Sequence, residues 1–152
     1  MAAETVPGGE GLMVQRILPR LILGLTLAGT PSFALASQAE DLGIDCKKAI
    51  STPDATLCIN DAYEVADKLL NEAYRAVMAS IDKGDTAPEV RKDWRKALVE
   101  AQRRWVAYRD AECEVTGFEW YGGTGRSGAV LDCARALTEA RAKALKLHAD
   151  PR

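Results

Sequence analysis

The sequence predicts an all-α fold, a small antiparallel helical bundle of about three main helices linked by two disulfides. Apolar residues recur at helical spacing in three long segments, which are separated by short breaks containing glycine or proline. No segment shows a sustained apolar–polar alternation typical of a half-buried strand. A chain of 152 residues suffices for one domain, and helices joined by short breaks at this size favour a bundle.

The first segment is interpreted as a targeting signal. Two basic residues, Arg16 and Arg20, precede the apolar stretch Leu21–Gly29, and an Ala-x-Ala pattern ends at Ala36. This order is typical of a secretory signal peptide. The apolar stretch is too short to span a bilayer as a helix, which needs about 20 residues.

The predicted organisation is therefore a signal peptide over residues 1–36 and a mature helical domain over residues 37–152. Residues 1–12 are polar and glycine-rich, so they are either an extra leader before a start at Met13 or a long beginning of the signal itself. No cysteine follows the apolar stretch directly, and we expect no membrane anchor after signal removal. The mature protein is expected to be periplasmic or secreted.

All four cysteines lie in the predicted mature part, and an even count in a small exported domain indicates disulfides. We favour the pairs Cys46–Cys58 and Cys113–Cys133, because each closes a short loop beside a helix end. Antiparallel helices would bring all four to one end of the bundle, so a Cys58–Cys113 pair is the open alternative. The spacings contain no CxxC, and we expect no metal site.

The first long helix is predicted to begin at residues 51–54, where a hydroxyl cap, a proline and an acid follow one another. It should end near Gly84, which is a typical C-terminal stop. Before it, residues 37–45 read as a lead-in without regular structure and residues 44–50 as a short helical turn. The predicted buried stripe of this helix is Ile59, Ala62, Tyr63, Ala66, Leu69, Leu70, Ala73, Val77 and Ile81.

The second long helix is predicted to open with a capping box at Thr86–Glu89 and to run out at Gly117. Its predicted buried stripe is Val90, Trp94, Ala97, Leu98, Ala101, Trp105, Tyr108 and Glu112. Basic residues are expected to cover its solvent face, namely Arg91, Lys92, Arg95, Lys96, Arg103, Arg104 and Arg109. A third helix follows a glycine-rich break over residues 117–128, and it should bury Val130, Ala134, Leu137, Arg141 and Leu145.

Several function classes are disfavoured by the composition. The net charge of −2 argues against a nucleic-acid partner. A single histidine, His148, leaves little scope for a histidine-based nucleophilic or zinc site. The GxGxxG letters at residues 123–128 follow a helix rather than a strand, so no dinucleotide or other cofactor is expected. Asp110 and Glu112 would point in different directions on a helix, and no catalytic residues are predicted.

The glycine-rich break is the candidate binding site. Tryptophan, tyrosine and arginine are typical of interface hot spots, and glycines allow a close backbone approach. The hypothetical partner-binding residues are Trp120, Tyr121, Gly122, Gly123, Arg126 and Ser127. The alternative for the aromatic residues is that Phe118 and Trp120 fold back to cap a thin core.

A second dense group, Trp105, Arg109 and Asp110, is interpreted as structural framework. Arg109 is expected to pair with an acid on another helix or with Asp110 itself. A pair with an acid on another helix would join the helices.

Taken together, these residues resemble the LprI-like domain, named for a lysozyme inhibitor. The resemblance covers about residues 46–147 and rests on the four cysteines and on the framework group. The residues that carry it are Cys46, Cys58, Leu70–Tyr74, Ala101–Trp105, Tyr108–Cys113, Gly122, Gly123, Cys133 and Arg141.

The resemblance implies a small, exported, α-helical protein that inhibits lysozyme by binding and not by catalysis. The expected partner is lysozyme or another envelope protein. Many lysozymes are cationic proteins. Residues 54–72 carry five acidic side chains and one basic side chain, Lys68, and this negative charge favours association with a cationic protein. The alternative is a cell-envelope structural or protein-interaction module without lysozyme activity.

Overall fold

The computed structural model describes residues 37–149, which form four helices. A short helix α1 spans Gln38–Asp41, and three long helices follow: α2 over Thr52–Lys83, α3 over Pro88–Glu119 and α4 over Arg126–Ala149. No strand occurs among the described residues. The all-α class with three main helices is thus confirmed, whereas the predicted signal peptide and leader lie outside the described residues.

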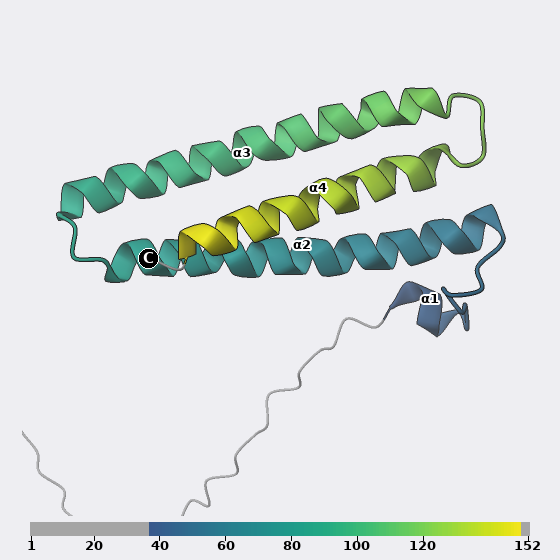
Figure 1. Cartoon of the computed structure of the whole chain (residues 1–152), viewed down its shortest axis with the longest axis horizontal. Coiled ribbons are helices and arrows are strands. Elements are labelled where there is room, and N and C mark those ends of the chain that lie inside the picture. Colours follow the sequence, from purple (N-terminus) through teal and green to yellow (C-terminus); the bar gives the residue numbers. More distant parts are fainter. Residues whose placement is uncertain (1–36, 150–152) are drawn as a thin grey trace, which may run out of the picture. The chain divides into compact units, whose positions relative to one another are not determined.

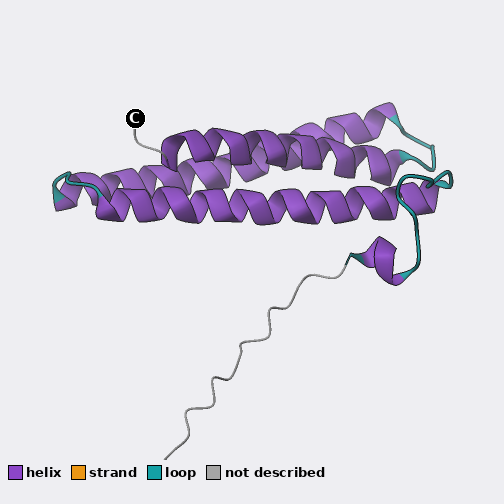
Figure 2. Ribbon diagram, turned by 60° about the horizontal axis from the view of Figure 1, so that its bottom comes forward, coloured by secondary structure: helices purple, strands orange, loops and turns teal. Residues whose placement is uncertain are grey.

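The three long helices run side by side with alternating direction along the chain (Figures 1 and 2). As a result α2 and α4 point the same way, and α3 runs against both. Most of the packing is between α2 and α4, α3 packs mainly on α4, and α2 touches α3 only slightly. None of these helices is long and apolar enough to cross a membrane.

Helix α2 begins and ends where the sequence predicted. The Ser51 hydroxyl accepts a hydrogen bond from the Asp54 amide at 3.2 Å, and Pro53 occupies the first turn. Gly84 is the C-terminal cap. These local signals succeed because each acts within one turn of the helix that it starts or stops.

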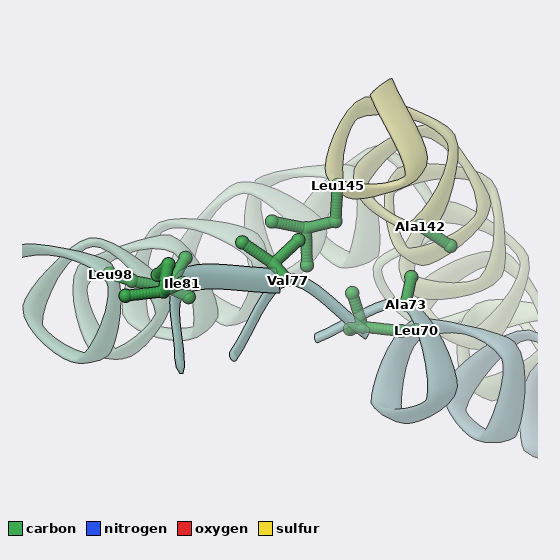
Figure 3. Packing of buried hydrophobic residues seen from close by; sticks show 7 residues of the cluster. All are labelled: Leu70, Ala73, Val77, Ile81, Leu98, Ala142 and Leu145. Carbon is green, nitrogen blue, oxygen red and sulfur yellow. The ribbon is translucent and has the colours of Figure 1, made fainter. Parts of the chain in front are cut away.

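The core lies between α2 and the second half of α4 and is extended by one residue of α3 (Figure 3). Its members are Leu70, Ala73, Val77, Ile81, Leu98, Ala142 and Leu145. Leu98 faces Ile81 near the α2–α3 turn, and Leu145 faces Val77. Most of the α2 stripe is confirmed, but Ala62 is exposed and Leu69 is 39% exposed, because α4 covers only the neighbouring face.

The predicted buried stripe of α3 is largely wrong. Among its members, Val90, Trp94 and Tyr108 are about half exposed, and Ala97, Ala101 and Glu112 are exposed as well. The buried residues of α3 are Leu98, Arg109, Cys113 and Gly117. Arg109 accordingly does not lie on the solvent face. The physical reason is that the disulfide at Cys113 and the close approach at Gly117 turn a different face of α3 toward α4.

Two further local expectations are corrected. The capping box at Thr86 does not form, since Ala87 is the N-cap of α3 and no side chain caps it. The lead-in is not free of structure, because α1 forms there and its first amides donate to Asp61 of α2. Residues 44–50 carry turns but no helix.

Both favoured disulfides form, Cys46–Cys58 and Cys113–Cys133, and no free cysteine occurs among the described residues. The predicted face of α4 is only half-buried apart from Leu145, while Thr138 and Ala142 are buried. The cause is the position of α4, which contacts α2 with one face and α3 with another.

Candidate functional site: the loop between α3 and α4

The glycine-rich loop joins two helices that are held firmly together at its base. The Cys113–Cys133 disulfide links α3 to α4. Nearer the loop, a Cβ atom on Gly117 would lie 2.8 Å from Cγ2 of Val130, so only glycine allows the two helices to approach this closely. The loop therefore starts from a fixed base.

The loop itself is a series of tight turns. The amides of Trp120, Tyr121 and Gly123 donate to the carbonyls of residues 117, 118 and 120 at 3.3, 3.1 and 3.0 Å. Gly122 has φ of 78°, a conformation that residues with a side chain rarely adopt. These hydrogen bonds and the conformation of Gly122 fix the backbone from which the aromatic side chains project.

The aromatic side chains of the loop are substantially exposed. Tyr121 is 81% exposed, Phe118 62% and Trp120 53%. The rings of Phe118 and Tyr121 are near parallel with centroids 6.5 Å apart. Phe118 therefore does not fold back over the core, and one edge of the Trp120 ring lies against Gly125 of the loop itself.

Arg126 is the first residue of α4, and its side chain contacts the end of α3. Its guanidinium forms an ion pair with Glu114 and lies 5.9 Å from the centroid of the Phe118 ring. Ser127, the next residue, is exposed. All six predicted binding residues thus lie at one end of the bundle, and their role in binding stays a prediction.

Two shallow hollows flank the loop where it meets the start of α2. One, of about 360 Å³, lies between Ile50, Ile59 and Trp120. The other, of about 600 Å³, is bordered by Pro53, Leu57 and Ser127. Sequence reasoning missed Ile50, which is 99% exposed. The available signal was an isolated large apolar residue directly before a helix cap.

We call this surface the loop end, defined by Ile50, Phe118, Trp120, Tyr121, Arg126 and Ser127. It combines exposed aromatic rings with the two hollows. Within residues 37–149 no cluster of histidine, cysteine or carboxylate side chains could hold a metal ion. The loop end offers aromatic rings that can be buried and charges that can be paired in a contact with a partner.

The framework group lies in the middle of the bundle, away from the loop end. Arg109 donates to Asp110 at 2.7 and 2.9 Å and to the buried Thr138 hydroxyl of α4 at 3.4 Å. Its guanidinium also lies over the rings of Trp105 and, on α2, Tyr63. Arg109 was predicted to pair either with an acid on another helix or with Asp110. The pair with Asp110 is confirmed.

A second arginine completes this group. Arg141 of α4 donates to Gln102 at 3.1 Å and lies 5.9 Å from the centroid of the Trp105 ring. Burial lowers the pKa of Arg141 from its ordinary value. Trp105 is therefore in contact with two cations, one from α3 itself and one from α4.

Several carboxylates of the acidic stretch of α2, residues 54–72, already accept hydrogen bonds from within the protein. Asp61 accepts hydrogen bonds from the Ser37 hydroxyl and from the amides of Gln38 and Ala39. Partial burial raises the pKa of Asp61, but these three hydrogen bonds outweigh it and hold the pKa below its ordinary value. Glu64 and Asp67 accept hydrogen bonds from asparagines on their own helix.

Comparison with known proteins gives a family match over most of the helical domain. A family model described as lysozyme inhibitor LprI matches residues 46–145. A protein of Rhizobium meliloti (strain 1021), itself described as uncharacterized, is 38% identical over 106 residues, which are 67% of this chain and 76% of that protein. No solved structure gives a significant match.

Proposed function

The chain belongs to the LprI lysozyme-inhibitor family, and from that premise we propose that it binds and blocks a lysozyme through the loop end. The action proposed is occlusion and not catalysis. The partner's saccharide-binding cleft is the surface that a protruding aromatic loop would fill.

The observation that carries this proposal is the exposure of Trp120 and Tyr121 on a fixed base. Aromatic side chains at 53% and 81% exposure leave much apolar surface to bury on binding. The disulfide and the close helix contact at Gly117 hold the loop in place beforehand. Such preorganisation lowers the entropy lost on association, which increases affinity.

Charge near the loop end favours a cationic partner. The last half of α3, residues 105–119, carries four acidic side chains and one basic one. Complementary charge accelerates association and orients the partner as it approaches. A basic lysozyme would therefore be guided toward this end of the bundle.

Arg126 has two roles in the proposed complex. Its ion pair with Glu114 and its contact with Phe118 hold the loop in shape. Its side chain is 38% exposed, so the remaining donors can reach carboxylates in a partner's cleft. Loss of Arg126 would weaken binding through both.

We further propose that the protein acts in the periplasm or outside the cell. Both disulfides require an oxidising compartment, and a lysozyme would be met there. The residues that would direct export lie before the described part of the chain.

The test is a turbidity assay in which the purified, oxidised protein is added to lysozyme acting on bacterial cells. Micromolar excess should slow clearing by a c-type or g-type lysozyme. Replacing Trp120 by alanine should raise the inhibition constant about 30-fold, since truncating an interface hot spot costs about 2 kcal/mol. Tyr121→Ala should act in the same direction.

The matched control is Leu147→Ala, which removes an exposed apolar side chain (68% exposed) from the other end of α4. It should inhibit as the parent protein does. Full potency in the Trp120→Ala and Tyr121→Ala variants would move the site away from the loop end. No slowing of either lysozyme class would contradict the proposed function and favour an envelope interaction module.

A further inference from the structure

The outer side of α3 carries a long apolar stripe that no other described element covers. Its positions follow one another in alternating steps of four and three residues. In order they are Val90, Trp94, Ala97, Ala101, Arg104, Tyr108, Ala111, Val115 and Phe118. All are exposed, and all but Arg104 are apolar or aromatic.

Steps of four and three give a repeat of 3.5 residues, which is the spacing of the contact seam in coiled coils. The stripe is distinct from the face that packs on α4, where Arg109, Cys113 and Gly117 are buried. Helix α3 has 32 residues and is therefore about 48 Å long. A seam of this length on a solvent-facing helix is a surface suited to a second helix.

The charges on α3 indicate which helix fits. Residues 88–104 carry six basic and three acidic side chains, whereas residues 105–119 carry one basic and four acidic ones. Two copies of α3 placed antiparallel would set the basic half of each against the acidic half of the other. Parallel copies would set like against like, which is unfavourable.

We propose that the α3 stripe is the interface of an antiparallel homodimer of this chain. The arrangement has two-fold symmetry, so each copy contributes the same surface to the contact. The loop end of each copy then lies beside the α2–α3 turn of the other.

The stripe is complementary to itself in one antiparallel register. When Trp94 is opposite Phe118 of the partner subunit, Ala101 is opposite Ala111 of the partner subunit. In the same register Arg104, the single charged position, is opposite Tyr108 of the partner subunit. A guanidinium over a tyrosine ring is a favourable contact, so the one interruption of the stripe finds a partner.

Sedimentation velocity tests this proposal. The sample is the protein expressed from the full-length chain and purified with both disulfides formed. The parent protein should sediment as a dimer whose share grows with concentration through the micromolar range. Ala101→Glu places a charge in the centre of the seam and should give a monomer with unchanged helix content. Ala140→Glu, the same change at an exposed site on α4, should leave the dimer intact.

Cross-linking of amines to carboxylates tests the orientation. Lys96 and Glu114 are about 27 Å apart along one helix, too far for a zero-length link within one copy. Links from Lys92 or Lys96 to Glu112, Glu114 or Glu119 in mixed isotope-labelled protein should therefore join two chains. Such links are expected only in the antiparallel arrangement.

Three results would overturn the proposal. They are a monomer at every concentration, a dimer that survives Ala101→Glu, and cross-links confined to like halves of α3. If Ala101→Glu instead abolishes a complex with lysozyme and the free protein is monomeric, the stripe binds that partner and not a second copy. Loss of lysozyme inhibition in Trp120→Ala with the dimer intact would leave both proposals standing, because Trp120 lies outside the stripe, which shares only Phe118 with the loop end.

Discussion

The guanidinium carbon of Arg109 lies 5.3 Å from the centroid of the Trp105 ring, one turn back on α3. The same guanidinium contacts Tyr63 of α2 and donates to Thr138 of α4. Arg109 is only 8% exposed and Thr138 is fully buried. One side chain thus contacts all three long helices where α2 and α3 otherwise meet only slightly.

We predict that Arg109→Lys destabilises the protein by about 2 kcal/mol. A lysine ammonium cannot stack on two rings while also donating two hydrogen bonds to Oδ1 of Asp110, because it lacks the planar fork of the guanidinium. Chemical denaturation followed by circular dichroism measures this loss. Arg103→Lys, at an exposed site on the same helix, is the control and should change stability by less than about 0.5 kcal/mol. Equal stability of the two variants would show that Arg109 acts only as a charge.

Gly117 gives a second test, of the contact between α3 and α4. Alanine there would place its Cβ atom 2.8 Å from Val130 and 3.2 Å from Arg126. The helices must separate or Val130 must move, and overpacking of this kind costs about 1–3 kcal/mol. Gly84→Ala is the matched control, because its Cβ atom would have ordinary contacts at 3.5 Å and φ is −68°. Thermal unfolding of both variants should separate them clearly.

The parts of the fold that follow from local chemistry could be predicted, and the parts set by neighbouring helices could not. The Ser51 cap, the Gly84 stop and the two disulfides each depend on residues close in sequence. The buried face of α3 depends on where α4 lies, and the apolar stripe read from the sequence proved to be mostly the outer one. Helix α1 was missed because its stabilising partner, Asp61, lies more than twenty residues away.

The candidate site shows the same division. The Trp120 and Tyr121 pair could be singled out from composition, since these residue types are typical of interface hot spots and lie among glycines. Ile50 stands out in the sequence as an isolated apolar residue, but its place in the site could not be predicted, because only the fold places its segment beside Trp120. The ion pair between Arg126 and Glu114 joins the two helices on either side of the loop. Predicting this ion pair would have required knowing which way each helix face points.

The two disulfides should differ in their resistance to reduction. Cys46 is exposed, whereas Cys113 is 1% exposed. A reductant must reach the sulfur that it attacks, so access controls the rate. Mild reduction followed by alkylation and mass spectrometry should label Cys46 and Cys58 first. Labelling of Cys113 should require denaturant, and equal rates for both pairs would contradict the buried position of Cys113.

Docking of α1 should depend on pH through Asp61. The folded-state pKa of Asp61 lies below its ordinary value of 3.8, so the stabilisation is fully present above that value. It is lost as the pH falls through the lower folded-state pKa, because the protonated carboxyl accepts these hydrogen bonds poorly. The amide resonances of Gln38 and Ala39 should shift in that acid range. Asp61→Asn should remove the titration and Glu40→Gln should keep it.

Salt should slow the association with a lysozyme more than it speeds dissociation. The acidic half of α3 is exposed at Glu112 and Glu119, and charges at the edge of an interface mainly steer the approach of a partner. The double variant Glu112→Gln with Glu119→Gln should therefore bind several-fold more slowly at low salt, with a similar dissociation rate. Asp85→Asn removes one acid at the opposite end of the bundle and should leave both rates unchanged. If the slowing appeared in the dissociation rate instead, these carboxylates would be direct contacts in the complex, since only bonds formed in the bound state resist its separation.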